Sequence, residues 1–375
     1  MHALLICQKK PHFYNLKKCL QYKRWSIFAL MVTEMSISDY FNQKLDLAVI
    51  DVRSPGEFAK GNIKDAVNIP LFSDTERAEV GTVYVQQSKE KAIELGYQFV
   101  TPKLEWFIDE SRKVAGTNPV IVYCWRGGIR SHAFAEHLLK NGFNNVYLIV
   151  GGYKSFRNHV LDFFEQNFKL KVLGGYTGSG KTHVLKSLKE LGEQVIDLEG
   201  IAHHKGSAFG AIGEKTQPTF EQFEADLFYL MSVLNLKAPI WVEDESINIG
   251  KVRIPVNLYH QIRTQKVYFI DIPKEKRAEH LSLEYSSFGN NVLMDAINTV
   301  SKKLGGQNAK LAIELLEQNN YYEVAMLALN YYDKAYLRGV SSRNQEMVCK
   351  ISLADLNHHK NAEKIIEIAK QHEQN

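Results

Sequence analysis

The feature that most constrains the fold is an apolar run followed by a glycine-rich loop, Gly175-Tyr176-Thr177-Gly178-Ser179-Gly180-Lys181-Thr182. Residues 170–173 before the loop indicate a strand, and residues 182–191 after it favour a helix. A Gly-x4-Gly-Lys-Thr sequence between a strand and a helix is typical of a phosphate-binding loop. Its backbone N–H groups cradle a diphosphate, its lysine reaches the outer phosphates and its threonine binds Mg²⁺. The residues predicted to bind a di- or triphosphate are Gly175, Gly178, Ser179, Gly180, Lys181 and Thr182.

A second loop, at residues 123–131, places a cysteine directly after another buried apolar strand. Its sequence is Tyr-Cys-Trp-Arg-Gly-Gly-Ile-Arg-Ser, and a helix is expected to follow from Ser131 to Lys140. Such a turn directs backbone N–H groups and a helix N-terminus toward Cys124, and positive surroundings lower the pKa of a thiol. We therefore predict that Cys124 is catalytic, within an anion-binding loop formed by Arg126, Gly127, Gly128 and Arg130. An ordinary turn around an inert cysteine would not account for two arginines and two glycines beside one thiol.

Two polar segments follow further predicted strands. The apolar residues 240–242 are followed by Glu243-Asp244-Glu245. A phosphate-loop fold needs a carboxylate for its metal at this place, so Asp244 and Glu245 are candidate Mg²⁺-associated acids. A solvated strand end is the alternative. Adjacent histidines rarely bind one metal, so no zinc site is predicted in the segment 197–207, and no metal ligand set is firmly assigned. This segment instead supplies candidate substrate contacts, namely Glu199, His203, His204 and Lys205.

Strands alternate with helices in two successive stretches, which predicts an α/β fold with parallel sheets. We expect one α/β domain at residues 35–160, a second at residues 161–273 that contains the phosphate loop, and a helical C-terminal region at residues 274–375 without a convincing strand. Ligands of open parallel sheets gather at the carboxyl ends of the strands, where both loops lie.

Residues 1–34 differ from the rest of the chain, since they contain lysines and arginines but no acid before Glu34. A disordered extension or a start codon placed too far upstream is favoured over a transit peptide. The apolar stretch at residues 25–32 is too short to span a membrane, so no membrane partner is expected. Four scattered cysteines argue against a disulfide framework and for a reducing, cytoplasmic location. A net charge of +4 is compatible with a polyanionic partner such as RNA.

The region from about Ser36 to Val160 resembles the rhodanese family of sulfurtransferases. The resemblance rests on residues 51–58 (Asp-Val-Arg-Ser-Pro-Gly-Glu-Phe), on residues 61–70 and on the cysteine loop. It implies that Cys124 carries a persulfide, or its selenium counterpart, as a covalent intermediate. A dual-specificity phosphatase shares the thiolate-and-arginine chemistry, but the upstream motifs favour the rhodanese-like alternative.

The order of the motifs along the whole chain resembles the tRNA 2-selenouridine synthase family. Residues 197–210 and Glu243-Asp244-Glu245-Ser246 also fit that family, and the similarity covers about Ser36 to Tyr336. It implies a rhodanese-like domain joined to a P-loop domain. It also implies a tRNA partner with 2-thiouridine at the wobble position, whose sulfur is first alkylated by geranyl diphosphate. Selenium from selenophosphate then displaces the S-geranyl group, and a selenophosphate-producing enzyme is an expected partner.

Two other functions remain open at this point. One is a simple sulfurtransferase with a regulatory, nucleotide-binding P-loop domain, and the other is a kinase with a silent rhodanese module. The spacing of the phosphate loop does not distinguish geranyl diphosphate from a nucleotide.

Overall fold

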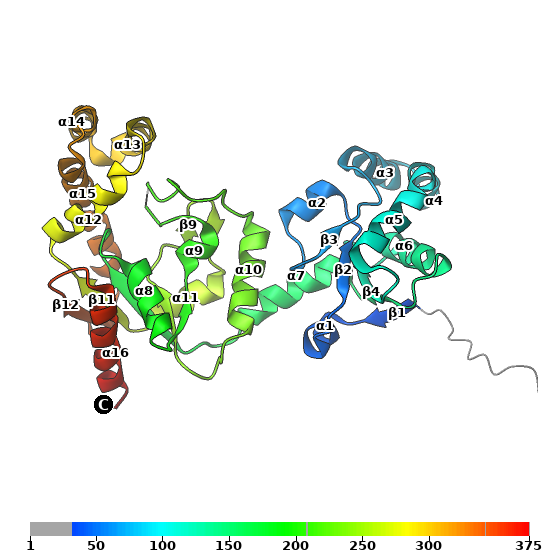
Figure 1. The fold of residues 1–375 in the computed structure, drawn as a ribbon, viewed down its shortest axis with the longest axis horizontal. Coiled ribbons are helices and arrows are strands. Elements are labelled where there is room, and N and C mark those ends of the chain that lie inside the picture. Colours follow the sequence, from blue (N-terminus) through cyan, green and yellow to red (C-terminus); the bar gives the residue numbers. More distant parts are fainter. Residues whose placement is uncertain (1–31, 208, 342, 375) are drawn as a thin grey trace, which may run out of the picture.

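The computed structural model describes residues 32–207, 209–341 and 343–374, which form two lobes joined through helix α7 (Gly152–Phe163) (Figure 1). The first lobe contains a five-stranded sheet in the order β1-β5-β4-β2-β3, and every neighbouring pair is parallel. Its strands are β1 (Val32–Met35), β2 (Ala48–Asp51), β3 (Val67–Asn68), β4 (Val120–Tyr123) and β5 (Val146–Ile149). The predicted α/β class with parallel sheets is confirmed.

The helices of the first lobe cover both faces of this sheet. They are α1 (Ile37–Gln43), α2 (Pro55–Lys60), α3 (Asp74–Gln86), α4 (Lys89–Val100), α5 (Leu104–Ala115) and α6 (Ile129–Lys140). Residues of α5 and α6 pack on one face, whereas α1 and α7 pack on the other. The start of α2 is fixed by a capping box, in which Ser54 and Glu57 satisfy each other's backbone N–H groups.

The second lobe contains another parallel five-stranded sheet, in the order β12-β11-β6-β8-β7. Its strands are β6 (Leu170–Gly175), β7 (Gln194–Ile196), β8 (Ile240–Glu243), β11 (Val267–Asp271) and β12 (Val348–Ser352), and a separate antiparallel pair is formed by β9 (Asn248–Ile249) and β10 (Val252–Arg253). Helices α8 (Lys181–Glu190) and α16 (His358–Gln374) pack on one face of the sheet. The other face is covered by α9 (Leu198–Ala202), α10 (Phe220–Ser232) and α11 (Val256–Thr264).

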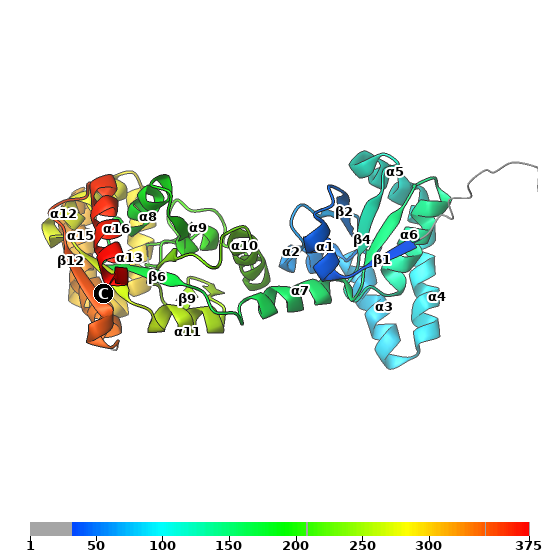
Figure 2. The same ribbon diagram turned by 90° about the horizontal axis from the view of Figure 1, so that it is seen from below.

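Four helices form a separate cluster at the outer end of the second lobe (Figures 1 and 2). They are α12 (Lys274–Ser286), α13 (Asn290–Leu304), α14 (Gly306–Glu317) and α15 (Tyr321–Ser341). The helical character expected after residue 273 is therefore present.

Two edge strands differ from the expectations. β12 lies in the region where no strand was expected, yet it pairs in parallel with β11, and its Lys350 forms an ion pair with Asp271 across the two strands. β1 begins at Val32, inside the segment assigned to the N-terminal extension, and pairs with β5. The remainder of that extension, residues 1–31, lies outside the described residues.

The two lobes share one hydrophobic core. Residues of α7, such as Tyr153 and Phe156, contact both the first sheet and α10 of the second lobe, so α7 is a packed element as well as a connection. This helix also crosses the domain limit predicted at residue 160, and that limit stays a prediction.

Candidate functional site

Cys124 lies immediately after β4, at the carboxyl end of the first sheet, where it is almost fully buried. The backbone N–H of Gly128 donates a hydrogen bond to its Sγ atom at 3.3 Å, and the hydroxyl of Ser131 lies 3.2 Å from the same sulfur. Gly127 has a φ of 64°, in the left-handed region that favours glycine, and so curls the loop back around the thiol. The predicted loop is thus formed, with a backbone N–H directed at the sulfur.

The turn between β5 and α7 holds this loop in place. The backbone N–H of Tyr153 donates to the carbonyl oxygen of Cys124 at 2.8 Å, and that of Lys154 donates to the carbonyl oxygen of Trp125 at 2.9 Å. Gly152 has a φ of 57°, and a Cβ atom there would lie 2.2 Å from the carbonyl oxygen of Cys124. Only glycine therefore permits this close approach of two backbone segments.

The two arginines of the loop have different environments. Arg130 forms an ion pair with Glu57, with 2.9 Å between Nη1 and Oε2. Burial tends to raise the pKa of Glu57, but the charge and hydrogen bond of Arg130 outweigh it and lower that pKa. Arg126 is exposed, and it has no ion-pair partner among the residues that the structure describes. It is therefore the arginine that is available to an anionic ligand.

Glu57 was not predicted as part of the site. Its local role, at the third position of the Ser54 capping box, could be inferred from sequence spacing. Its pairing with Arg130, which lies 73 positions away in the chain, could not.

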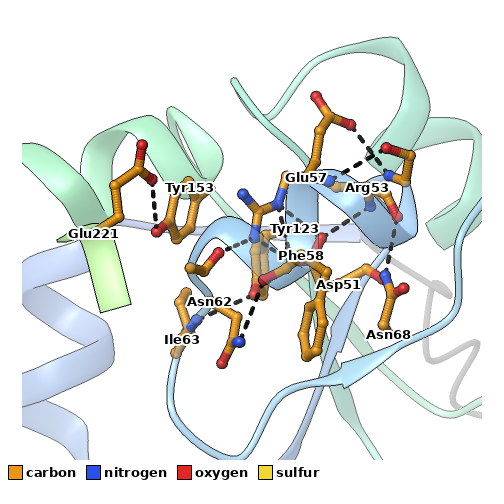
Figure 3. A network of polar contacts seen from close by, with 12 residues as sticks. Asp51, Arg53, Glu57, Phe58, Asn62, Ile63, Asn68, Tyr123, Tyr153 and Glu221 are labelled. Atoms are coloured by element: carbon orange, nitrogen blue, oxygen red, sulfur yellow. Dashed lines mark hydrogen bonds and ion pairs between the residues drawn. The ribbon is translucent and has the colours of Figure 1, made fainter. Parts of the chain in front are cut away.

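A polar network around the buried Arg53 lies beside the contact between Tyr153 and the second lobe (Figure 3). Arg53 is fully buried and donates to Asp51 through Nε and Nη2, and Nη2 also donates to the carbonyl oxygen of Gly61 at 2.7 Å. The guanidinium of Arg53 lies 3.7 Å from the ring centroid of Tyr153, a cation–π contact. The hydroxyl of Tyr153 donates to Glu221 in the second lobe at 3.2 Å.

The phosphate loop connects β6 to α8, as predicted, and lies in the second lobe. Gly178 and Gly180 have φ angles of 76° and 73°, which places their backbone in the left-handed conformation. Lys181 Nζ donates to the carbonyl oxygen of Gly175 at 3.3 Å, so the lysine lies across the loop. Arg277 supports the loop from α12, because it donates to the carbonyl oxygen of Thr177 at 3.1 Å while paired with Asp333.

A cavity of about 1220 Å³ opens above the phosphate loop. The loop and the predicted acids Asp244 and Glu245 form its polar wall, together with Glu199 and Lys205. Its apolar lining comes from the helical cluster and from the segment between α9 and α10, through Phe209, Leu281, Tyr285, Phe288, Val300 and Tyr332. The cavity therefore suits a ligand with a phosphate head and an apolar body.

The acids in this cavity have distinct partners. Asp244 is buried and paired with Arg343 and Arg263, and it also accepts a hydrogen bond from the Tyr336 hydroxyl at 3.2 Å. Glu199 accepts a hydrogen bond from Thr182 Oγ1 at 3.0 Å, next to the position where Mg²⁺ is expected. Burial and the neighbouring charge of Glu199 raise the pKa of Glu245 to about 8. Glu199, predicted as a substrate contact, is thus the acid that contacts the loop threonine.

The histidines predicted as substrate contacts do not line this cavity. A ring nitrogen of His203 lies 2.9 Å from the carbonyl oxygen of Thr216, and His204 accepts a hydrogen bond from the N–H of Gly206. Both therefore stabilise the loop that carries them. Lys205 does line the cavity, where it is paired with Glu284 and Glu214.

The two loops occupy separate cavities, because a second cavity beside Cys124 shares no lining residue with the one at the phosphate loop. Within the described ranges, no group of three or more His, Cys, Asp or Glu side chains is arranged to hold a metal ion. None of the helices in the described part of the chain is long and apolar enough to cross a membrane.

Comparisons with known proteins match both lobes. Residues 38–159 match the rhodanese-like domain, and residues 168–365 match the tRNA 2-selenouridine synthase AAA domain. The tRNA 2-selenouridine synthase of Nitrosomonas europaea is 33% identical over 80% of this chain and 90% of that protein. The chain belongs to the tRNA 2-selenouridine synthase family.

Two further members show the same extent of similarity. The tRNA 2-selenouridine synthase of a Sulfurovum species is 35% identical over 77% of this chain and 87% of that protein. That of Bdellovibrio bacteriovorus is 34% identical over 84% of this chain and 94% of its own length. The chain is therefore an enzyme of this family, with Cys124 in its rhodanese-like part and the phosphate loop in its AAA part.

Proposed function

We propose that this enzyme replaces the sulfur of 2-thiouridine at the wobble position of tRNA by selenium, in two steps. In the first, the sulfur attacks C1 of geranyl diphosphate, and diphosphate leaves with the electrons of the C–O bond. In the second, selenium of selenophosphate attacks C2 of the base, geranylthiolate leaves, and hydrolysis of the Se–P bond releases phosphate. Alkylation makes sulfur a better leaving group, which is why the first step precedes the second.

The phosphate-loop cavity is the proposed site of the first step. Its glycine-rich loop and Lys181 suit a diphosphate, whereas Phe209, Leu281 and Val300 in the same lining suit an apolar chain. Thr182 and Glu199, joined by a hydrogen bond, are the residues that would hold Mg²⁺, which neutralises charge on a departing diphosphate.

The cysteine loop is the proposed site of the second step. The backbone N–H of Gly128 donates to the sulfur of Cys124, the hydroxyl of Ser131 lies beside it, and the exposed Arg126 supplies positive charge for an anionic selenium donor. We propose that this loop, with Cys124, binds selenophosphate and positions its selenium for attack on the base. Selenophosphate would come from a separate enzyme in the same cytoplasm.

The observation that carries the proposal is the presence of a thiol loop and a phosphate cradle as two separate cavities in one chain of this family. Two cavities without shared residues fit two successive reactions on one RNA better than they fit a single reaction.

Separate assays of the two steps test this assignment. Purified enzyme is incubated with 2-thiouridine tRNA, geranyl diphosphate and selenophosphate, and the nucleosides are analysed by mass spectrometry. Cys124→Ser is expected to abolish selenation and to leave S-geranylation intact. Lys181→Ala is expected to weaken geranyl transfer by roughly tenfold or more, because one charged contact to the diphosphate is lost.

Other outcomes would contradict specific parts of the proposal. Normal selenation by Cys124→Ser would exclude the role given to the thiol. Unchanged geranyl transfer by Lys181→Ala would exclude geranyl diphosphate as the ligand of the phosphate loop. Rapid ATP hydrolysis without tRNA would favour a nucleotide-regulated sulfurtransferase or a kinase.

A further inference from the structure

Helices α3 and α4 lie next to each other on one side of the first lobe (Figure 2). Residues of both helices and of the cysteine loop line an apolar groove. Its volume of about 630 Å³ lies in the range of small-molecule sites. Cys124 is part of the wall of this groove, and the apolar residues of the wall include Val80, Tyr84, Ile93, Tyr97 and Ile129. The groove therefore begins at the reactive sulfur and extends between two helices.

The helix α3 keeps its apolar side chains at least partly exposed. None of its 13 residues is buried. Tyr84 is 59% exposed and Val85 82%, and across the groove Tyr97 is 58% and Ile129 52% exposed. Large apolar side chains that gather around one concavity mark a binding surface, because a soluble protein rarely exposes such a patch without a ligand.

Four charged residues line the groove. Three of them, Arg77, Arg126 and Arg130, belong to the cysteine loop or to the ion-pair cluster around Glu57, and the fourth, Lys89, lies at the start of α4. Arg77 and Arg130 are both engaged by Glu57, at 3.6 Å and 2.9 Å. Arg126 is left without an ion-pair partner among the described residues. The groove is thus suited to an apolar chain whose reactive end lies beside Cys124 and Arg126. It does not suit an RNA backbone, which needs cations along its length.

We propose that this groove holds the ten-carbon chain of the S-geranyl group while C2 of the same base reacts beside Cys124. The inference rests on the proposed function and adds the place where the leaving group is bound. Because the chain is attached to the sulfur that leaves C2, it begins at the reacting carbon and must extend over the adjoining surface. The apolar surface that adjoins Cys124 is this groove.

The groove also explains the order of the two steps. An unmodified 2-thiouridine has no chain to bury, so it gains nothing from the groove, whereas the S-geranyl base is held with C2 at the reaction site. Selenation is thereby restricted to bases that have already been alkylated.

Chain-length dependence of selenation tests the proposal. Short anticodon RNAs with S-geranyl, S-dimethylallyl or S-methyl 2-thiouridine are incubated with selenophosphate, and kcat/KM is measured for each. Full-length wild-type enzyme should prefer S-geranyl over S-methyl by about tenfold or more, since even one methylene in an apolar pocket changes kcat/KM by roughly that factor.

Variants in which a larger side chain fills the groove provide the second test. Ile93→Trp and Val80→Trp should remove the preference for S-geranyl while leaving geranylation of 2-thiouridine unchanged, because that step is assigned to the other cavity. Glu94→Trp is the matched control, since Glu94 is exposed on the same helix and does not line the groove. It should keep the preference of the wild type.

Equal kcat/KM values for S-geranyl and S-methyl RNA in the wild type would overturn the proposal, as would an unchanged preference in a folded groove-filling variant. In either case the two-step function would stand. If the wild type selenates none of the three RNAs, the proposed function itself fails. Two variants on different helices keep the test decisive if one of them does not fold.

Discussion

At the scale of single residues, the three acids around the phosphate loop have two different roles. Asp244 is neutralised by Arg343 and Arg263, so its charge holds β8 to the segments that carry those arginines. Glu199 and Glu245 instead face the cavity near Thr182 and Lys181. Without a ligand, these two carboxylates repel each other, and the repulsion favours a protonated Glu245.

Replacing Glu245 by glutamine should therefore stabilise the ligand-free enzyme in a pH-dependent way. The pKa of Glu245 is raised from 4.5 to about 8, so the folded state keeps a proton that the unfolded state releases above its lower pKa. Wild-type stability accordingly falls as pH rises from about 4.5 to 8, and glutamine has no such loss. Glu245→Gln should gain about 1–3 kcal/mol relative to wild type between pH 5 and pH 9.

Denaturant unfolding at both pH values, in buffer with EDTA, measures this difference. The exposed Glu190 on α8 gives the control, and Glu190→Gln should show a nearly constant difference from wild type across the same range. A stability difference for Glu245→Gln that does not change with pH would contradict the raised pKa.

At the scale of elements, the turn into α7 sets the shape of the cysteine loop. A Cβ atom at Gly152 would meet the carbonyl oxygen of Cys124 at 2.2 Å and the backbone nitrogen of Gly127 at 2.6 Å. Gly152→Ala should therefore displace the loop and lower the selenation rate by about tenfold or more, because misplaced reacting groups are costly. S-geranylation should stay near the wild-type rate.

Gly142→Ala is the control variant, because it adds backbone strain at a glycine without a steric collision. Gly142 has a φ of 92°, but a Cβ atom there would have nothing within 4 Å. This variant should lose about 1 kcal/mol of stability and keep its selenation rate. Equal effects of the two substitutions on selenation would show that the loop does not depend on the close approach at Gly152.

The elements also show what the sequence alone could predict. Both loops were predicted with their flanking strands and helices, because their chemistry lies in contiguous residues with fixed spacing. The edge strands β1 and β12 were missed, because each is short, bears polar residues and is recognisable only by its parallel partner. The Glu57–Arg130 pair, the contact of Glu199 with Thr182 and the apolar groove all depend on residues brought together by tertiary packing.

At the scale of the whole molecule, the two lobes are held together by side chains of α7. Arg157 forms an ion pair with Glu224 of α10, and Phe156 is fully buried in the core that both lobes share. The rings of Phe228 and Tyr229 on α10 lie 6.5 Å and 6.0 Å from that of Phe156. A core that continues from one sheet to the other should make the lobes unfold together.

Phe156→Ala tests this cooperativity. Removing a fully buried ring should cost about 3–5 kcal/mol, because a cavity remains in the shared core. Since the lost contacts join the lobes, we expect calorimetry to show one unfolding transition in the wild type and two in the variant. Leu161→Ala, at a position on α7 that is 43% exposed, should keep the single transition. A single transition at lower temperature in Phe156→Ala would mean that the polar contacts between α7 and α10 suffice to couple the lobes. Two transitions in the wild type would show that the lobes unfold independently.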